Sequence, residues 1–286
     1  MARAELDPTG TTEHLRAHAA AAARHAATRA GVDVRPLETL AELEEGSRLI
    51  SRIWVDDDPK APTSFLRALV HGGNFVAGAF DGRRLVGVSL GFFGLVRAEL
   101  YLHSHITGVD RALQGRSLGF ALKQFQRSWA LERGIDTIVW TADPLVRGNA
   151  FFNVVKLGAS MVDYHENFYG VLDDGLNAGD SDRVVLRWDL ASERAVHAAG
   201  GRHEEAVIGE GQIVLRAGEN DEPVTTSADG AVLIAWIPPN IVDIRERDPE
   251  LAAAWRRALR GTVGRALAEE FRVEAMTRDG RLVLRR

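Results

Sequence analysis

The chain has no cysteine among its 286 residues. This absence excludes disulfide bonds, thiolate nucleophiles and the zinc or iron–sulfur centres that cysteine ligates. Basic residues are not in excess either, because the formal net charge is −5. Nucleic-acid-binding proteins usually carry a basic excess. We therefore expect no nucleic-acid partner.

Long apolar runs are also missing. No stretch approaches the ~20 apolar residues that cross a bilayer. Arg24 and His25 interrupt the alanine-rich segment 19–27, and acidic residues precede it. That pattern is a poor match to a signal or transit peptide. We therefore expect a cytoplasmic protein with no membrane partner.

The residues that are present suffice for a sizeable core, since 45% of them are hydrophobic. The length fits one large domain or two modest ones. Residues 191–210 are polar and lack clear periodicity, so we expect a boundary there. The sequence predicts an N-terminal helical extension over 1–31, a main domain over 32–190 and a C-terminal α+β lobe over 191–286, without internal repeats.

Apolar periodicity and turn residues predict the order of the elements. Asp81-Gly82 stands between two apolar runs and is a hairpin signal. Loops are expected at 56–59 and 173–182. Strands are expected at 32–36, 75–80, 85–95, 100–109, 137–141, 164–171, 183–190 and 232–236, with a closing hairpin that turns at 278–281. Helices are expected at 11–27, 40–53, 64–70, 150–157 and 249–270, and one helix opens at 114 and stops at Gly134.

The segment 101–119 carries the strongest functional signal. Alternating residues predict a strand that is followed by a short connection and then by the helix that opens at Gln114. The helix has one apolar face, formed by Leu118, Leu122, Phe125 and Trp129. Small residues stand at its N-terminus, where backbone N–H groups lack partners and the helix dipole is positive. Such an end suits an anionic phosphate group.

Two motifs in this order resemble the GNAT N-acyltransferase superfamily. The superfamily signature (Arg/Gln)-x-x-Gly-x-(Gly/Ala) corresponds here to Gln114-x-x-Ser117-x-Gly119, with serine in place of the middle glycine. A second segment, N-x-x-x-x-x-x-K-x-G, runs from Asn149 through Lys156 to Gly158. The resemblance covers 32–190, and the whole chain looks like a poorly characterised bacterial branch of predicted acetyltransferases. It implies an α/β fold with a mixed, mostly antiparallel sheet flanked by helices, and an appended C-terminal α+β lobe.

The resemblance implies acetyl-CoA or another acyl-CoA as co-substrate, with no metal. The pyrophosphate would bind the turn formed by Gln114, Gly115, Arg116, Ser117, Leu118 and Gly119. The pantetheine arm would pair with the strand at Thr107, Gly108 and Val109, and a backbone N–H there would polarise the thioester carbonyl. Asn149, Asn153 and Lys156 complete the expected cofactor-binding residues.

The acceptor arrives as an ammonium group, and a base must remove a proton before its nitrogen can attack. Strict alternation would place Glu99, Tyr101, His103, His105 and Thr107 on one face of the strand. Some superfamily members carry a glutamate base eleven residues before the signature, and that position is His103 here. His105 and Glu99 are the alternatives, and both histidines could instead be hydrogen-bonded sheet residues. A metal pair of the two histidines would lack a third ligand.

Many superfamily members carry a tyrosine two residues before the lysine of the second motif, where it acts as general acid for the leaving thiolate. Val154 occupies that position here. Tyr164 and Tyr169 are alternative acids, or packing residues. Tyr164, Asn167, Tyr169 and Arg183 are the candidate substrate-binding residues. Arg183 could bind a substrate carboxylate or form a surface salt bridge with Asp180 or Asp182. Arg256, Arg257 and Arg260 are expected on a solvated helix face.

These expectations favour an acyltransferase that passes an acetyl or succinyl group from CoA to a primary amine by direct attack. The acceptor would be a small molecule such as an amino acid. The altered glycine and the missing tyrosine favour an alternative, a non-catalytic acyl-CoA-binding or regulatory module. A protein acetyltransferase is the third interpretation. The C-terminal lobe would then cover the acceptor site, recruit a target, or form a homodimer contact.

Overall fold

The computed structural model describes residues 8–54, 61–172, 179–203 and 208–286. The loop predicted at 56–59 and most of the one at 173–182 lie outside these residues. By its contacts the chain forms two compact units, Met1–Ile138 with Asp189–Gly200, and Val139–Trp188 with Gly201–Arg286. These units do not coincide with the three segments that composition suggested. None of the described helices is long and apolar enough to span a membrane.

The first unit begins with helices and then builds an antiparallel sheet. Most predicted elements are present here within a few residues of their expected bounds. In chain order the unit contains α1 (Pro8–Ala30), β1 (Asp33–Pro36), α2 (Leu40–Ile53), α3 (Thr63–His71), β2 (Phe75–Asp81), β3 (Arg84–Val96), β4 (Glu99–Val109), α4 (Leu118–Glu132) and α6 (Glu193–Ala199). Helix α6 falls in the stretch that showed no periodicity and was not expected from the sequence.

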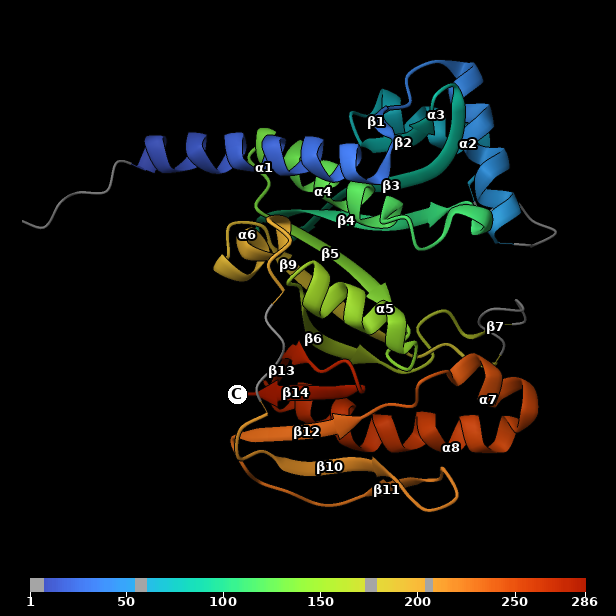
Figure 1. The fold of residues 1–286 in the computed structure, drawn as a ribbon, viewed down its shortest axis with the longest axis vertical. Coiled ribbons are helices and arrows are strands. Elements are labelled where there is room, and N and C mark those ends of the chain that lie inside the picture. The colour runs from blue at the N-terminus through green and yellow to red at the C-terminus, as the bar shows by residue number, and fades with distance from the viewer. Residues whose placement is uncertain (1–7, 55–60, 173–178, 204–207) are drawn as a thin grey trace, which may run out of the picture. The chain divides into compact units, whose positions relative to one another are not determined.

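The sheet of the first unit has the order β1-β2-β3-β4, and every neighbouring pair is antiparallel (Figure 1). Each face is covered by helices. Residues of α2 and α3 form one core cluster with Leu85, Leu90 and Ile106 of the sheet. Residues of α1 and α4 form a second cluster with Val34 and Val86 on the other side. The unit is therefore a three-layer α/β arrangement.

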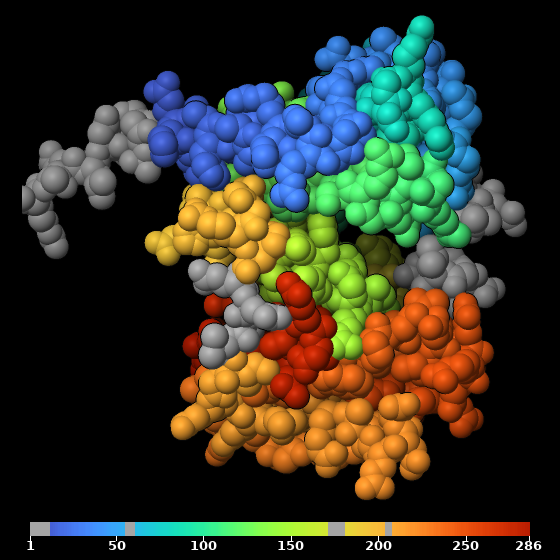
Figure 2. Space-filling model, viewed as in Figure 1, coloured from blue at the N-terminus to red at the C-terminus, as the bar shows by residue number. Residues whose placement is uncertain are grey.

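Helix α1 belongs to the core of this unit. Its alanines at 19, 22, 23, 26 and 30 are buried, and α1 packs along α4. Small side chains let two helices approach closely, so the alanine-rich composition is a packing feature. In Figure 2 the yellow atoms of α6 lie against the blue atoms of α1, and these two helices are in contact.

A β-bulge in β4 changes the face on which its side chains lie. Gly91 pairs with Ser104, whereas the preceding Leu90 pairs with Ile106. His105 is therefore the extra residue of the bulge. Ile106 joins the cluster under α2 and α3, and the hydroxyl of Ser104 is bonded to α4. The alternation predicted for 99–107 breaks at this point.

The second unit contains the remaining strands. In chain order it contains β5 (Thr137–Ala142), which begins in the first unit, then α5 (Arg147–Phe151), β6 (Ser160–His165), β7 (Val171–Leu172), β8 (Gly179–Asp180), β9 (Arg183–Asp189), β10 (Gln212–Ala217), β11 (Pro223–Thr225), β12 (Val232–Trp236), α7 (Ile241–Arg247), α8 (Pro249–Leu259), α9 (Arg265–Ala268), β13 (Arg272–Met276) and β14 (Arg281–Arg285). Strands β10 and β11 and helix α7 were not expected from the sequence.

The strands of this unit have the order β5-β9-β6-β13-β14-β12-β10-β11, and β7 and β8 form a separate pair. The C-terminal strands join the others where Val273 of β13 pairs with Met161 of β6 (Figure 1). From β9 to β11, within the described part of the chain, β10 and β12 pair in parallel and the other neighbours pair antiparallel. The fold class is the predicted one, a mixed α/β fold with a mostly antiparallel sheet flanked by helices.

Two elements of the second unit differ from their expected form. The strand predicted at 164–171 starts earlier, as β6, and ends at His165, because 166–169 form a turn. The long helix predicted at 249–270 is present as α8, a π-helical segment Arg260–Gly264, and α9. Asp248 caps α8 through Leu251 N–H, and Pro249 occupies its first turn, as expected.

Candidate functional site

A tight turn joins β4 to α4 in the first unit. Gly115 has a φ of +87° and Ser117 a φ of +62°. Ser117 occupies the position of the middle glycine in the superfamily signature. A left-handed backbone costs a residue with a side chain about 1–2 kcal/mol. The geometry therefore explains why glycine suits this position, and serine adopts the same conformation.

The first turn of α4 offers unpaired backbone donors. Ala121 N–H donates to the carbonyl of Ser117 over 3.0 Å, which is the first hydrogen bond of the helix. The N–H groups before Ala121 therefore lack an acceptor within the helix. The Ser117 side chain does not cap the helix. Among the described residues, no acceptor is found for the N–H groups of 117–120. These donors and the helix dipole fit a pyrophosphate.

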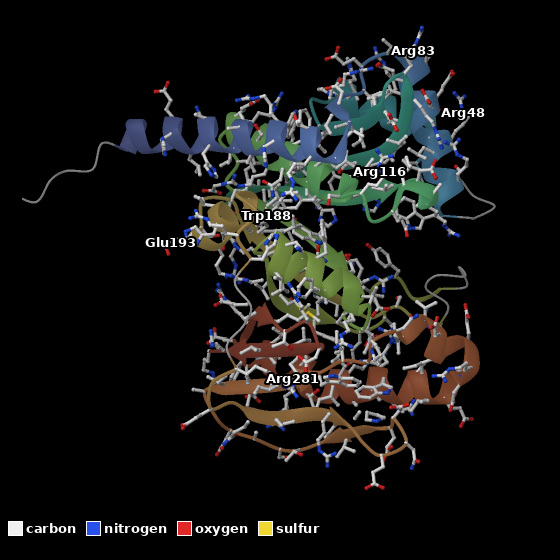
Figure 3. The ribbon with its side chains drawn as sticks, in the orientation of Figure 1. Arg48, Arg83, Arg116, Trp188, Glu193 and Arg281 are labelled. Atoms are coloured by element: carbon white, nitrogen blue, oxygen red, sulfur yellow. The ribbon has the colours of Figure 1, made fainter. Side chains whose placement is uncertain are left out.

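The turn is open and carries a basic residue. A Cβ atom at Gly119 or at Gly115 would meet no atom within 4 Å. Arg116 is about half exposed, and its guanidinium lies 3.7 Å from the carboxylate of Asp81 (Figure 3). Gln114 is exposed, whereas Leu118 is buried against α1 and the sheet. The residues predicted to bind pyrophosphate thus form one continuous surface turn.

The predicted pantetheine strand lies at the end of β4. Val109 pairs with Gly87 of β3, and the Thr107 hydroxyl lies 2.8 Å from that of Ser89. A Cβ atom at Gly108 would lie 2.6 Å from the Trp54 ring, so only glycine fits there without movement. This contact fixes the end of α2 against the strand.

The two histidines lie together, away from Thr107. The His103 ring stacks on Phe92 at a centroid distance of 4.9 Å, and the His105 ring lies 6.1 Å from His103. Thr107 bonds to Ser89, which is on the opposite face of β3 from Phe92. The expectation that Thr107 shares a face with His103 and the alternate residues before it is therefore wrong, because the bulge at His105 reverses the alternation.

Both histidines are neutral at physiological pH. Burial, together with repulsion from the protonated forms of His105 and Lys123, lowers the pKa of His103 to about 4. Burial also lowers the pKa of His105. Glu99, the other candidate base, is exposed at the start of β4. Lys123, a buried lysine of α4, was not among the residues predicted from the sequence.

The second motif lies in the second unit. Asn149 is exposed on α5, and its side-chain oxygen accepts a hydrogen bond from Asn153 over 3.2 Å. Asn153 is buried and Lys156 is partly buried in a π-helical turn, Phe152–Lys156, that continues α5. Such π-turns occur frequently at functional sites. Val154, at the position of the superfamily tyrosine, is 2% exposed.

A buried network surrounds Tyr164. Its hydroxyl donates to Asp182 over 2.5 Å, and Arg260 donates to the same carboxylate over 2.6 and 2.7 Å. Burial opposes the charge of Asp182, but the bonds from Arg260, Tyr164 and Asn167 N–H outweigh it and lower the pKa of Asp182. Burial and the Asp182 bond raise the pKa of Tyr164. This proton is firmly held, which disfavours Tyr164 as a general acid.

The turn after β6 is held against the start of β9. Phe168 N–H donates to the carbonyl of Ser181, and Tyr169 N–H donates to its hydroxyl over 2.9 Å. Asn167 has a φ of +48°. Phe168 and Tyr169 remain 45% and 46% exposed, with their rings 4.7 Å apart. A pinned turn therefore presents two aromatic rings to solvent.

Several arginines of this unit that were expected at the surface are buried or partly buried. Arg183 is 7% exposed, and its guanidinium lies 5.4 Å from the Tyr169 ring, so it is not a surface residue. Arg256 and Arg260 were expected on a solvated face. Instead, Arg256 is buried and donates to Asp143 over 2.8 and 3.1 Å. Arg256 and Arg260 pair with carboxylates that are distant in the sequence. Of the three arginines expected on the solvated face, Arg257 alone is exposed.

Comparison with known proteins found a curated relative over part of the chain. No protein-family model matches the chain. A segment of 82 residues, 28% of the chain, is 37% identical to the N-alpha-acetyltransferase RimI of Mycobacterium tuberculosis (strain ATCC 25618 / H37Rv). The match covers 51% of that protein, so the chain spans about half the length of this curated relative.

Solved structures are similar over a little more than half of the chain. The ribosomal-protein-S18-alanine N-acetyltransferase from Escherichia coli is 17% identical, with 57% of this chain and 97% of that chain covered and a TM-score of 0.43. FeeM, an N-acyl amino acid synthase from uncultured soil microbes, is 15% identical, with coverages of 58% and 96% and a TM-score of 0.43. One segment of the chain is thus similar to a curated N-alpha-acetyltransferase, and the two motifs resemble those of the GNAT N-acyltransferase superfamily.

Proposed function

We propose that the chain is an acyl-CoA-dependent N-acyltransferase that passes an acetyl or succinyl group to the primary amine of a small molecule, such as an amino acid. The observation that carries this proposal is the set of unpaired N–H groups at 117–120, in an open turn before α4. In this proposal the turn 114–119 binds the pyrophosphate, and 107–109 pair with the pantetheine arm. No metal takes part.

The reaction needs positioning, proton removal and charge stabilisation. The amine nitrogen attacks the thioester carbonyl, the carbon–sulfur bond breaks, and the CoA thiolate leaves. A backbone N–H near Val109 stabilises the developing oxyanion. His103 and His105 hold no proton at neutral pH because their pKa values are lowered, so either can accept the amine proton directly or through water. Glu99 is the third candidate.

Residues of the second unit complete the proposal. Asn149, Asn153 and Lys156 assist acyl-CoA binding, as the second motif implies. Tyr169 is the candidate acid for the thiolate, since the Tyr164 proton is held by Asp182. A thiolate also leaves without an acid, because its conjugate thiol is far more acidic than an alcohol. Asn167, Tyr169 and Arg183 are proposed to recognise the acceptor, with Arg183 suited to a carboxylate.

A protein N-terminus is the second acceptor class. The relative that shares 37% identity over 82 residues is an N-alpha-acetyltransferase, and this favours an α-amine on a polypeptide. The replacement of the usual tyrosine by Val154 favours a third function, acyl-CoA binding without turnover. A homodimer contact through the C-terminal strands and helices stays a prediction, which light scattering on the purified chain tests.

Release of free CoA thiol tests the proposal. The chain has no cysteine, so a thiol reagent meets no background from the protein. Acetyl-CoA and succinyl-CoA are each incubated with amino acids, polyamines and short peptides with free N-termini. Thiol release that depends on an amino acid or polyamine supports the small-molecule proposal, and release with peptides alone assigns the second class. Calorimetric binding of acyl-CoA without release would favour the binding module, and absence of binding would refute the site.

A further inference from the structure

A lysine of α4 reaches β4 at the residue before the bulge. The amino group of Lys123 donates a hydrogen bond to the hydroxyl of Ser104 over 2.8 Å and another to the side-chain oxygen of Gln126 over 3.1 Å. Lys123 and Ser104 are 4% and 5% exposed, so their contact lies inside the first unit, where α4 packs on β4 (Figure 1). The contact joins the helix to the strand where the pairing of β3 with β4 changes register.

The bulge residue His105 lies between two anchored neighbours. On one side, Ile106 is buried in the apolar cluster under α2 and α3. On the other side, the Ser104 hydroxyl is bonded to Lys123 of α4. An extra residue in one strand has no partner across the ladder, so its place depends on these neighbours. Loss of the bond from Lys123 would remove the anchor on the Ser104 side.

The backbone and ring of His103 are also closely placed. A Cβ atom at Gly91 would lie 2.7 Å from the carbonyl oxygen of His103, so only glycine lets β3 approach it. Phe92, which packs on the cluster under α2 and α3, stacks on the His103 ring and lies 5.8 Å from the His105 ring. Ser104 joins the two histidines in the chain, so any displacement of Ser104 moves both rings.

Lysine is a destabilising residue at this position. Burial disfavours the charged form of an amino group, and it lowers the pKa of Lys123 to about 7. A methionine has a similar length and would occupy the same space without this penalty. Residues that work against the stability of the fold are expected mainly where function needs them. The placement of Lys123 therefore suggests that it serves the neighbouring histidines and not the core.

We propose that Lys123 is a positioning residue for His103 and His105, which holds the bulge through Ser104 and thereby determines where both imidazole rings lie. The inference rests on the proposed function, in which these histidines are the candidate bases. It gives a task to a buried group that the proposed mechanism does not use. Lys123 acts through Ser104 and takes no proton from the acceptor.

The charge of Lys123 also acts on His103. Repulsion from the protonated forms of His105 and Lys123 adds to burial in lowering the pKa of His103. In the described part of the chain, these are the charged groups that act on it from β4 and α4, whereas the cluster that α2 and α3 form around Ile106 is apolar. Lys123→Met removes one of these repulsions, so the pKa of His103 should rise from about 4 toward 6.5.

Proton NMR of the whole chain tests the positioning directly. In Lys123→Met and in Ser104→Ala, the imidazole signals of His103 and His105 should move away from those of the parent, and Lys123→Met should also raise the titration midpoint of His103. Ser104→Thr keeps the hydroxyl and should restore the parent signals. Ser128→Ala is the matched control, because it removes another buried hydroxyl, on α4. Unchanged imidazole signals in Lys123→Met, or equal displacements in Ser128→Ala, would overturn the proposal.

Turnover separates positioning from a purely structural role. In the CoA thiol assay, Lys123→Met and Ser104→Ala should lower kcat about tenfold or more with unchanged CoA affinity, and Ser104→Thr should recover most of the loss. Circular dichroism checks that each variant is folded. Displaced imidazole signals with the kcat of the parent would refute the positioning role. A parent chain without turnover would refute the acyltransferase proposal, whereas the NMR comparison still decides whether Lys123 places the rings.

Discussion

The side-chain nitrogen of Lys123 lies 2.8 Å from the hydroxyl oxygen of Ser104 and 3.1 Å from the side-chain oxygen of Gln126. Lys123 is 4% exposed. Both of these oxygen atoms are neutral, so they do not offset the cost of burying its charge. Burial accordingly lowers the pKa of Lys123 to about 7.

Lys123→Met should therefore raise the free energy of unfolding near pH 7 by about 1 kcal/mol or more. The unfolded lysine titrates near 10.5 and the folded one near 7. Between these values the unfolded state binds more protons, so the parent gains stability as pH rises. Urea unfolding at pH 7 and pH 9 should show the advantage of Lys123→Met shrinking at the higher pH. Lys156→Met, at a partly exposed lysine, is the control, and a pH-independent difference would contradict the argument.

Two substitutions of Ser117 should have different effects on the free energy of unfolding. Ser117→Gly relieves the left-handed strain but adds entropy to the unfolded chain, so stability should change by less than about 1 kcal/mol. Ser117→Val places a β-branched residue at a φ of +62° and should destabilise by about 1–2 kcal/mol. Chemical denaturation measures both variants. Equal stability of the two would show that the turn adopts another conformation in solution.

Gly119→Glu should abolish detectable CoA binding without unfolding the chain. No atom lies within 4 Å of a Cβ at this position, so the fold accommodates the side chain, while its charge opposes the phosphate. Gly119→Ala is the matched control and should retain most of the affinity. Calorimetry with CoA measures both, and unchanged affinity of Gly119→Glu would remove the turn from the proposed site.

His103 should titrate far below an ordinary histidine. Its pKa of about 4 predicts that its imidazole signals in proton NMR shift near pH 4, with His103→Gln identifying them. Between pH 4 and 6.5 the unfolded state binds the additional proton, so His103 makes the unfolding free energy rise with pH in that interval. A midpoint near 6.5 would mean that the ring is more solvated than its stacking on Phe92 indicates.

The same variant tests catalysis. His103→Gln should lower kcat at least tenfold with unchanged CoA affinity, the size expected for loss of a proton acceptor. His105→Gln is the comparison. If both variants turn over like the parent, neither histidine is the base, and Glu99 is the next candidate.

Arg260→Met should be more disruptive than Tyr164→Phe. Removing Arg260 leaves the buried Asp182 carboxylate without its cation, at a cost of about 3–5 kcal/mol. Tyr164→Phe removes one hydrogen bond to the same carboxylate and should cost about 1–3 kcal/mol. Denaturant unfolding measures both, with Arg257→Met as the exposed control from the same helix. A cost for Arg260→Met no larger than that of Arg257→Met would contradict the network.

Local patterns predicted the elements well where they are long and periodic. Helices α1, α2 and α3 and strands β2 to β5 lie within a few residues of their expected positions, because apolar spacing and turn residues such as Asp81-Gly82 determine them locally. The turn at 114–119 was predicted for the same reason. Its charged and small residues are adjacent in the sequence and need no distant partner to form.

The features that depend on distant partners could not be predicted in this way. The bulge at His105 is a mismatch between two strands, so it leaves no mark on β4 alone. Arg256 and Arg260 look like surface residues until Asp143 and Asp182, more than seventy positions away, are placed beside them. Strands β10 and β11 are short, and pairing in the sheet stabilises them more than their own periodicity does.

Arg127 donates two hydrogen bonds to the carbonyl of Leu190 from inside the first unit, over 2.7 and 3.1 Å. The segment Asp189–Gly200 thus belongs to a unit whose other residues end at Ile138. During synthesis, the guanidinium of Arg127 can form these bonds only after some sixty further residues have left the ribosome. A nascent chain stopped before Leu190 would leave that cation without its carbonyl acceptor in an unfinished core.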